Sequence, residues 1–318
     1  MKVFITRKVF DCAVDRLRSA GLDVDMYERD ERIPREELLL RVRGTAGIFS
    51  FLHDRIDAEV MDSAGEHLQI IANFAVGYDN IDIDEAKRRG IVVTNTPGVL
   101  TDATAELAWA LLLSTARLIV PADRFTREGK FTGWSPTLML GMGITGKTLG
   151  VIGAGRIGTA MALKSKGFEM RVLYTSRRDN ELLNRELSAI RVELDTLVEE
   201  SDFISIHTSL TPETHHLIGE RELRMMKRDC VLVNTARGAV IDERALLRAL
   251  RERWIFGAGL DVYEFEPKIT EGLCELENVV LLPHIGSATR EVREKMATMA
   301  AEEICRVLSG KEPINRVV

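Results

Sequence analysis

Three short segments in the last third of the chain carry side chains that could do acid–base and anion chemistry. These are residues 233–238, 259–267 and 282–287, and they contain Arg237, Glu266 and His284. An imidazole can exchange a proton with a substrate near neutral pH. A carboxylate beside it would orient the ring and favour its charged form. Arginine stays cationic and can hold a carboxylate. The three residue types predict proton transfer on a small anionic substrate.

A glycine pattern, G-x-G-x-x-G, lies at Gly153, Gly155 and Gly158, directly after an apolar segment and before a segment with helical periodicity. This is the context that dinucleotide binding requires. The first glycine allows a tight turn, the second lets the backbone approach a pyrophosphate, and the third lets the helix pack on the strand. The N–H groups at the helix start favour the anion. A purely structural glycine-rich turn is the alternative. The residues expected to contact the cofactor here are Gly153, Ala154, Gly155, Arg156, Ile157 and Gly158.

The segment after the next expected strand bears on the choice between NAD and NADP. An acidic residue there would accept a hydrogen bond from the ribose 2′-hydroxyl, but this chain has Ser176, Arg177 and Arg178. A hydroxyl and two guanidinium groups suit a 2′-phosphate. A solvated basic loop is the alternative, and Asp179 weakens the signal. We expect NADPH as the preferred cofactor, with NADH possible.

The composition excludes several classes of protein. The 318 residues are 45% hydrophobic and 29% charged with a net charge of −6, so no global basic field attracts nucleic acid or a membrane surface. The most apolar stretch, 107–116, is half of the about 20 residues that a membrane span needs. The four cysteines form no C-x-x-C pair, which favours reduced thiols in the cytoplasm. We expect no metal, because His53 and His67 lack ligand spacing. His215 and His216 are adjacent in a loop after Pro212, and neighbours of this kind on a helix would face apart.

Alternating strand and helix patterns form two series and predict an α/β protein with two doubly wound parallel sheets. The expected strands of the first series are 3–6, 24–27, 47–50, 69–72 and 90–93. Those of the second are 149–152, 170–174, 203–206, 230–234, 257–260 and 279–282. Between the series we expect a crossover helix at 103–118 closed by Pro121, and then an extended arm. A final helix is expected at 289–308.

Each of the three chemical segments follows an expected strand of the second series. Ligands of open α/β sheets bind beyond the carboxyl ends of the strands. We therefore expect Arg237, Glu266 and His284 to converge beside the nicotinamide.

In these segments and the glycine loop, the chain resembles the D-isomer-specific 2-hydroxyacid dehydrogenases over essentially its whole length. Segments 73–80, 173–177 and 283–287 are most similar to those of the glyoxylate/hydroxypyruvate reductases. The resemblance implies reduction of glyoxylate or hydroxypyruvate to glycolate or D-glycerate. It implies that Arg237 binds the substrate carboxylate, that Glu266 is the partner of the histidine, and that His284 is the acid/base.

The two series of strands and helices also predict a domain division, with the final helix returning to the first domain. Residues 1–99 and 287–318 would form a flavodoxin-like substrate domain, and residues 100–286 a Rossmann cofactor domain. The arm at 120–146 would join a homodimer. In it, Trp134 either packs locally or narrows the active site of the partner subunit.

Further contacts are expected from the resemblance. The N–H groups of Val76 and Gly77 would hold the substrate carboxylate, although Gly77 could equally be only a turn residue, and Leu52 would line the substrate site. Asp261 would lie near the nicotinamide amide or act as a helix N-cap, and Thr104 would touch the cofactor phosphates or simply start its helix. The remaining expected cofactor contacts are Thr235, Ala236 and Gly286.

Two alternatives stay open. An enzyme of the same family could act on D-3-phosphoglycerate or another D-2-hydroxyacid, although phosphoglycerate members often carry an acid at the ribose position. The chain could instead be a non-catalytic NAD(H)-sensing binding protein, like the corepressors built on this fold. The intact set of Arg237, Glu266 and His284 argues against the binding protein.

Overall fold

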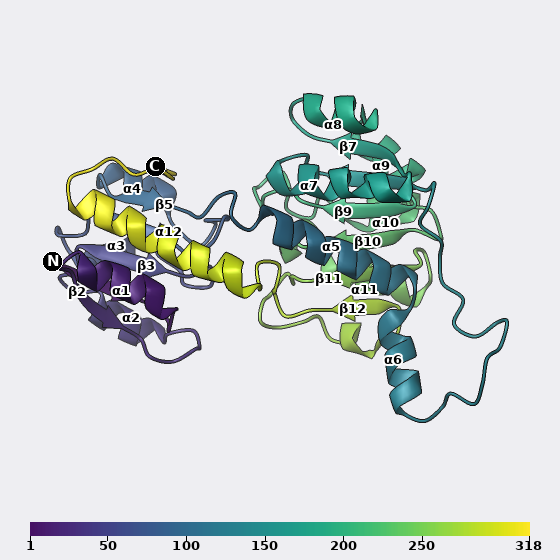
Figure 1. Ribbon diagram of the computed structural model, residues 1–318, viewed down its shortest axis with the longest axis horizontal. Helices are drawn as coiled ribbons and strands as arrows, with labels where there is room; N and C mark the ends of the chain where they lie inside the picture. The colour runs from purple at the N-terminus through teal and green to yellow at the C-terminus, as the bar shows by residue number, and fades with distance from the viewer. The chain divides into compact units, whose positions relative to one another are not determined.

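The computed structural model describes residues 1–318, which form two compact units. Unit 1 comprises Met1–Leu100 and Ser287–Val318, and unit 2 comprises Thr101–Gly286. The chain passes from one unit to the other after Leu100 and returns after Gly286, so that the yellow C-terminal helix and the purple N-terminal elements belong to the same unit (Figure 1).

Unit 1 is built on a parallel sheet with the strand order β2-β1-β3-β4-β5, which is the flavodoxin-like order. Its strands are β1 (Lys2–Ile5), β2 (Asp23–Met26), β3 (Gly47–Ser50), β4 (Ile70–Asn73) and β5 (Val92–Thr94). Its helices are α1 (Asp11–Ser19), α2 (Arg35–Arg41), α3 (Ala58–Ala64), α4 (Ile83–Arg88) and α12 (Arg290–Leu308). Helices α1 and α12 cover one face of the sheet, and α2, α3 and α4 cover the other.

Unit 2 is built on a seven-stranded parallel sheet with the order β12-β11-β10-β9-β6-β7-β8. Its strands are β6 (Thr148–Ile152), β7 (Arg171–Thr175), β8 (Ile190–Arg191), β9 (Phe203–Ile206), β10 (Val231–Asn234), β11 (Gly257–Leu260) and β12 (Val279–Leu281). From β6 the chain first runs to β7 and β8 and then crosses to β9 on the other side of β6. This reversal is the topological switch point of a Rossmann sheet, where dinucleotides bind.

The helices of unit 2 form a layer on each face of its sheet. They are α5 (Thr101–Ala116), α6 (Ile119–Arg127), α7 (Arg156–Lys164), α8 (Glu181–Leu187), α9 (Leu194–Glu200), α10 (Glu220–Met225) and α11 (Glu243–Arg251). Short 3-10 turns lie at η1 (Ser165–Phe168), η2 (Gly238–Val240) and η3 (Leu273–Glu275). The predicted α/β class and both doubly wound parallel sheets are confirmed. The two-residue strand β8 was not predicted, because it is too short to show a hydrophobic pattern.

Helix α5 is the predicted crossover, and it packs against β10, β11 and α7. Gly257 and Gly259 permit this close approach, since a Cβ at either position would lie 2.9 Å from a side chain of α5. No single helix is long and apolar enough to cross a membrane. Helices α5 and α6 together have the length and apolar composition of a membrane span, but the chain bends by 63° between them. Much of α5 is also buried within unit 2.

The expectation that Pro121 closes the crossover helix is wrong. Helix α5 ends at Ala116, and Pro121 lies in the first turn of α6. A proline is tolerated there because the first N–H groups of a helix have no intrahelical partner. The arm is therefore helical as far as Arg127, and only 128–147 is irregular (Figure 1).

Candidate active site

The glycine loop has the geometry that dinucleotide binding requires. Gly153 follows β6 in the left-handed region with φ +95, and a Cβ there would lie 2.8 Å from the backbone of His207. A Cβ on Gly158 would lie 2.0 Å from the carbonyl oxygen of Gly153, so only glycine lets α7 start this close to the strand. Gly155 is the N-cap of α7, is exposed, and has open space in front of its Cα. The helix N-terminus is thus accessible to a phosphate group.

Asn180 holds this loop in place, although it is not among the predicted site residues. Its side-chain amide donates to the carbonyl oxygen of Ala154 at 3.0 Å and to Oγ1 of Thr159 at 2.7 Å. Its side-chain oxygen caps α8 by accepting from the N–H of Leu183. An asparagine before a helical pattern signals an N-cap, but its reach to the glycine loop depends on the packing of β6 against β7.

His207 follows β9 at the switch point and was also missed. Its N–H donates to the carbonyl oxygen of Ile152, the last residue of β6, at 2.7 Å. Its Nε2 lies 2.8 Å from Oγ of Ser205. Burial of the imidazole lowers the pKa of His207 to about 3, so the ring is neutral at physiological pH. A lone histidine after an apolar strand has no spacing that would have identified it.

The basic segment after β7 is exposed at Arg177 and Arg178. Asp179, which weakens the case for a phosphate, forms an ion pair with Arg191 at 3.5 Å. Arg191 also donates to the carbonyl oxygen of Ser176 at 2.9 Å. Because Arg191 engages the carboxylate, Arg177 and Arg178 remain as a pair of cations beside the glycine loop.

The segment after β10 offers a buried hydroxyl to a ligand. Oγ1 of Thr235 is buried and has no hydrogen-bond partner within the protein. Asn234 shapes this turn by accepting from the N–H of Ala236 and donating to the carbonyl oxygen of Arg237, both at 2.9 Å. A buried polar atom without a partner is costly unless a ligand or water satisfies it. Thr235 and the open helix end at Gly155 therefore fit a bound dinucleotide.

The structure brings the three predicted chemical residues to one edge of the sheet. Arg237, Glu266 and His284 follow the adjacent strands β10, β11 and β12. Nδ1 of His284 lies 2.9 Å from Oε2 of Glu266, and both side chains are mostly buried. The other carboxylate oxygen of Glu266 accepts from the N–H of Tyr263 at 3.0 Å. Glu266 therefore fixes the imidazole through Nδ1.

Asp261 holds the backbone that carries His284. Its two carboxylate oxygens accept from the N–H groups of Ile285 and Gly286, each at 2.7 Å. Burial raises the pKa of Asp261 above its ordinary value. The alternative that it caps a helix is wrong, because its partners lie in the loop after β12. Thr104 holds the same loop, because its buried hydroxyl donates to the carbonyl oxygen of Gly286 at 3.2 Å.

In unit 1, Val76 and Gly77 lie in the loop after β4. Asn95 donates to the carbonyl oxygen of Val76 at 2.8 Å, and Asn73 donates to that of Gly77 at 2.9 Å. These bonds use the carbonyl groups and leave the two N–H groups for a ligand. Leu52 follows β3 and is half-buried.

The adjacent histidines lie close together in a turn. The rings of His215 and His216 lie side by side, with centroids 4.0 Å apart. The expected loop is confirmed, but the argument that adjacent histidines face apart holds for a helix and does not apply here. The segment is a turn in which His216 has a left-handed φ of 52.

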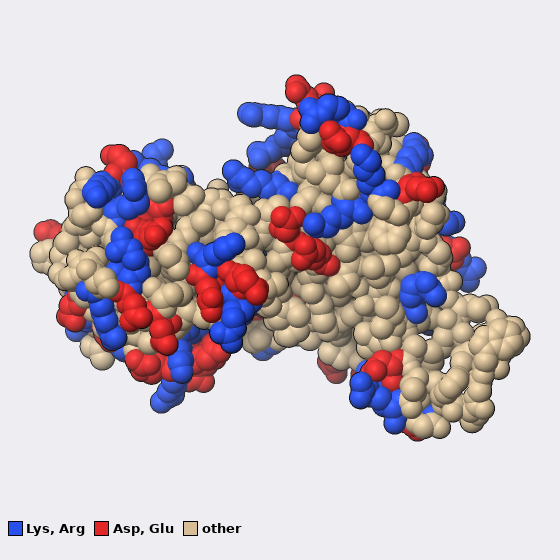
Figure 2. All heavy atoms as spheres, viewed as in Figure 1, with Lys and Arg blue, Asp and Glu red and all other residues tan.

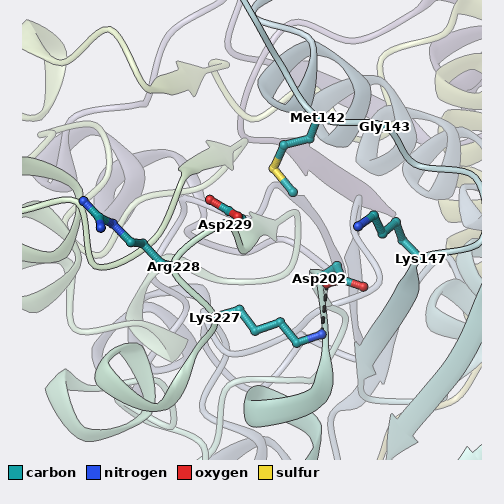
Figure 3. A pocket seen from close by; sticks show the side chains of 7 residues that line it. All are labelled: Met142, Gly143, Lys147, Asp202, Lys227, Arg228 and Asp229. Carbon is teal, nitrogen blue, oxygen red and sulfur yellow. Dashed lines mark hydrogen bonds and ion pairs between the residues drawn. The ribbon is translucent and has the colours of Figure 1, made fainter.

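A separate pocket of about 250 Å³ lies at the edge of the sheet that is formed by the amino ends of its strands (Figure 3). Several of its lining residues directly precede the strands β6, β9 and β10, and Lys227 pairs there with Asp202 at 2.9 Å. This edge is remote from the carboxyl ends that carry Arg237, Glu266 and His284. The pocket is therefore not the site of the predicted chemistry.

Comparisons with known proteins agree with this geometry. Residues 109–286 match the family model described as "D-isomer specific 2-hydroxyacid dehydrogenase, NAD binding domain". A glyoxylate reductase of Thermococcus litoralis is 50% identical, covering 99% of this chain and 96% of the relative.

Two solved structures extend the likeness to the fold. A protein of Thermus thermophilus has a TM-score of 0.94 at 47% identity, with 100% of both chains covered. An NADPH-dependent glyoxylate/hydroxypyruvate reductase from Sinorhizobium meliloti, solved with NADP and malonate, has a TM-score of 0.86 at 31% identity, covering 100% of this chain and 96% of that one. The chain therefore belongs to the D-isomer-specific 2-hydroxyacid dehydrogenases and is an oxidoreductase with a domain for a nicotinamide dinucleotide.

Proposed function

We propose that this enzyme reduces glyoxylate, and also hydroxypyruvate, to the corresponding 2-hydroxyacids with NADPH. The observation that carries the proposal is the contact of 2.9 Å between His284 and Glu266, at the strand edge that also carries Arg237. It is supported by the glyoxylate reductase that is 50% identical over nearly the whole chain.

When bound, a reduced nicotinamide would supply a hydride to the keto carbon of the substrate. Negative charge then grows on the keto oxygen, and Nε2 of His284 donates a proton to it. Glu266 binds Nδ1, which orients the ring and stabilises the imidazolium before the transfer. In the opposite direction, the neutral ring accepts the proton of the hydroxyl group.

Arg237 binds the carboxylate of the substrate and polarises the neighbouring carbonyl group. Its backbone is held by Asn234, and its Nη1 donates to the carbonyl oxygen of Ala236 at 2.9 Å. Gly238 locks the segment further, because a Cβ there would lie 1.8 Å from the backbone of Tyr263. A pre-positioned guanidinium group reduces the loss of freedom when substrate binds. For unit 1, we propose that the N–H groups of Val76 and Gly77 bind a substrate carboxylate and that Leu52 contacts the carbon chain.

The preference for NADPH over NADH is part of this proposal. Position 176 is a serine where an acidic residue would favour NADH, and Arg177 and Arg178 are exposed. Asp179 forms an ion pair with Arg191. These features support the preference. The two guanidinium groups bind the 2′-phosphate. Arg156 and Ile157 at the start of α7, together with Thr235, Ala236 and Gly286, would hold the rest of the dinucleotide.

The enzyme works as a homodimer through α6 and the segment that follows it. No residue of α6 is buried within the subunit, and Trp134 is 84% exposed. Segment 131–146 contains no charged residue, and the arm accordingly shows a large area without blue or red atoms (Figure 2). A patch of this kind is typical of a protein interface. All four cysteines are free, which fits a reducing compartment, and we assign the enzyme to the cytoplasm.

The test is an initial-rate assay that follows the absorbance of the reduced nicotinamide. Glyoxylate, hydroxypyruvate, pyruvate and phosphohydroxypyruvate are each offered with NADPH and with NADH. Rapid oxidation of NADPH by glyoxylate or hydroxypyruvate is expected. A higher kcat/KM with phosphohydroxypyruvate overturns the substrate assignment, and a higher kcat/KM with NADH overturns the cofactor assignment. Tight binding of NADPH without turnover of any ketoacid would instead identify a binding protein.

A further inference from the structure

Two adjacent histidines and a carboxylate form a cluster in unit 2 that the proposed reaction does not use. One ligand atom each from His215, His216 and Glu264 lies within 4.8 Å of the others. The two imidazole rings are 4.0 Å apart at an angle of 31°, and Nε2 of His216 lies 2.8 Å from Oε1 of Glu264. Two imidazoles and one carboxylate are the ligand types that Zn²⁺ and related transition metals prefer.

The backbone holds the two histidines on the same side. The N–H of His215 donates to the carbonyl oxygen of Thr211, which closes a turn before the pair. The N–H of His216 donates to the carbonyl oxygen of Ala239 at 2.8 Å, and that of Ile218 to Val240 at 3.0 Å. These bonds fix His216 at φ 52, a conformation that a non-glycine residue adopts only when its surroundings impose it.

The surroundings of Glu264 favour a cation. Its side chain is 9% exposed, and the neighbouring Glu243 is 3% exposed. The N–H of Glu243 donates to Oε2 of Glu264, and the N–H of Glu264 donates to Oε1 of Glu243, each at 3.3 Å. Neither carboxylate forms an ion pair with a lysine or arginine. The N–H and the hydroxyl of Thr270 also donate to Oε2 of Glu243, whereas Oε1 of Glu264 contacts the imidazole of His216. A divalent ion between Glu264 and the histidines would add the positive charge that no lysine or arginine supplies there.

We propose that His215, His216 and Glu264 bind one divalent transition-metal ion such as Zn²⁺, with water as the fourth ligand. Ligands of a tetrahedral zinc ion with bonds of about 2.0–2.1 Å are about 3.3 Å apart. To reach that spacing, His216 and Glu264 must move slightly apart from their present contact of 2.8 Å, and the exposed side chain of His215 must rotate toward them. The N–H of Glu243 already orients the second oxygen of Glu264, as an outer-shell partner should.

Binding would stiffen the segment that carries the catalytic carboxylate. Glu264 lies two residues before Glu266, and the metal would tie it to the turn at 211–216. The site is thus structural, and its occupancy is expected to raise the thermal unfolding temperature of the whole enzyme.

The test is a calorimetric titration of the tag-free, full-length enzyme with zinc chloride, repeated with cobalt chloride and optical spectroscopy. The variants are H215Q and H216N, since asparagine tolerates the left-handed conformation. The control is H67Q, which removes an exposed histidine of unit 1. Wild type and H67Q are expected to bind one ion with equal affinity, whereas H215Q and H216N bind it about tenfold or more weakly. The Co²⁺ spectrum should lack the charge-transfer band of a thiolate ligand.

Crystals soaked with zinc locate the ion by its anomalous scattering. A peak between His215, His216 and Glu264 is expected. The proposal is overturned by undiminished affinity in H215Q, by a peak elsewhere, or by the absence of binding to the wild type. Circular dichroism establishes whether H216N is folded, and H215Q alone decides the matter if it is not, because His215 is exposed.

Discussion

Asp261 positions His284 through the backbone of the two residues that follow the histidine. Oδ1 and Oδ2 of Asp261 accept from the N–H groups of Ile285 and Gly286, both at 2.7 Å. His284 itself has a φ of 55, which is unfavourable for a residue with a Cβ. A side chain from the loop after β11 therefore maintains the strained loop after β12, so the proposed acid/base and the residue that positions it follow neighbouring strands.

Replacing Asp261 with asparagine is expected to impair both stability and turnover. The new NH₂ group would face a backbone N–H in a site that is 1% exposed. The free energy of unfolding should fall by about 1–3 kcal/mol, and kcat should fall at least about tenfold because His284 loses its position. Urea unfolding and steady-state kinetics measure the two effects, with the exposed Asp229→Asn as the control. An unchanged kcat in D261N would show that Asp261 does not position the histidine.

Replacing His284 with glutamine is expected to lower kcat by about 10²–10⁴-fold, the usual contribution of a general acid.

Replacing Glu266 with glutamine should lower kcat less than the loss of His284, because the imidazole ring remains. In E266Q the imidazole loses the carboxylate that orients its ring, so kcat should fall about tenfold or more. Steady-state kinetics with glyoxylate measure both variants. An unchanged kcat in E266Q would contradict the pairing of the two residues in function.

Replacing Arg237 with lysine is expected to weaken substrate binding although the charge is kept. An ammonium group cannot offer the planar pair of donors that a carboxylate accepts. The KM for glyoxylate should rise about 10- to 100-fold, as for the loss of one charged hydrogen bond. The KM for the cofactor should stay unchanged. The matched control is R228K at an exposed position, and equal KM values in the two variants would exclude Arg237 as the anchor.

Replacing Arg177 and Arg178 together with alanine is expected to change cofactor use alone. The KM for NADPH should rise about tenfold or more, because charged hydrogen bonds to the 2′-phosphate are lost. The KM for NADH should change little, since it has no phosphate there. The control is R185A, which removes an exposed arginine of α8. A similar rise for both cofactors would indicate damage to the loop rather than loss of phosphate recognition.

His207 is expected to make the protein less stable in mild acid. Its pKa is about 3 in the folded state and about 6.5 when unfolded, so between these values the unfolded chain binds the additional proton. The free energy of unfolding should therefore fall as the pH decreases from 6.5, by about 1.5 kcal/mol at about pH 5 from this residue. In H207N that contribution disappears. Urea unfolding at about pH 6.5 and about pH 5 measures how far the free energy of unfolding of each protein falls. An equal fall in the wild type and in H207N would refute the role of His207.

Much of the fold could be predicted because its strands are short, apolar and regularly separated by helical patterns. Buried strands of a parallel sheet read as continuous hydrophobic runs, as in β4 and β9. Prediction failed where the segment is too short to show a hydrophobic pattern, or where a residue suits two kinds of position. Strand β8 has only two residues, and Pro121 suits a first helical turn as well as a helix end.

The sequence by itself determined the residue types and their order along the chain: the glycine loop before a helix, and Arg237, Glu266 and His284 each after a strand. These are local properties, since a turn or a helix start depends on neighbouring residues. Only the tertiary structure decided which groups from distant segments meet. Asp261 accepts from Ile285, Asn180 binds the glycine loop, and Glu264 lies against His216, across separations of 24, 26 and 48 residues. Such contacts depend on strand order and register, and therefore on how the whole sheet packs its buried faces.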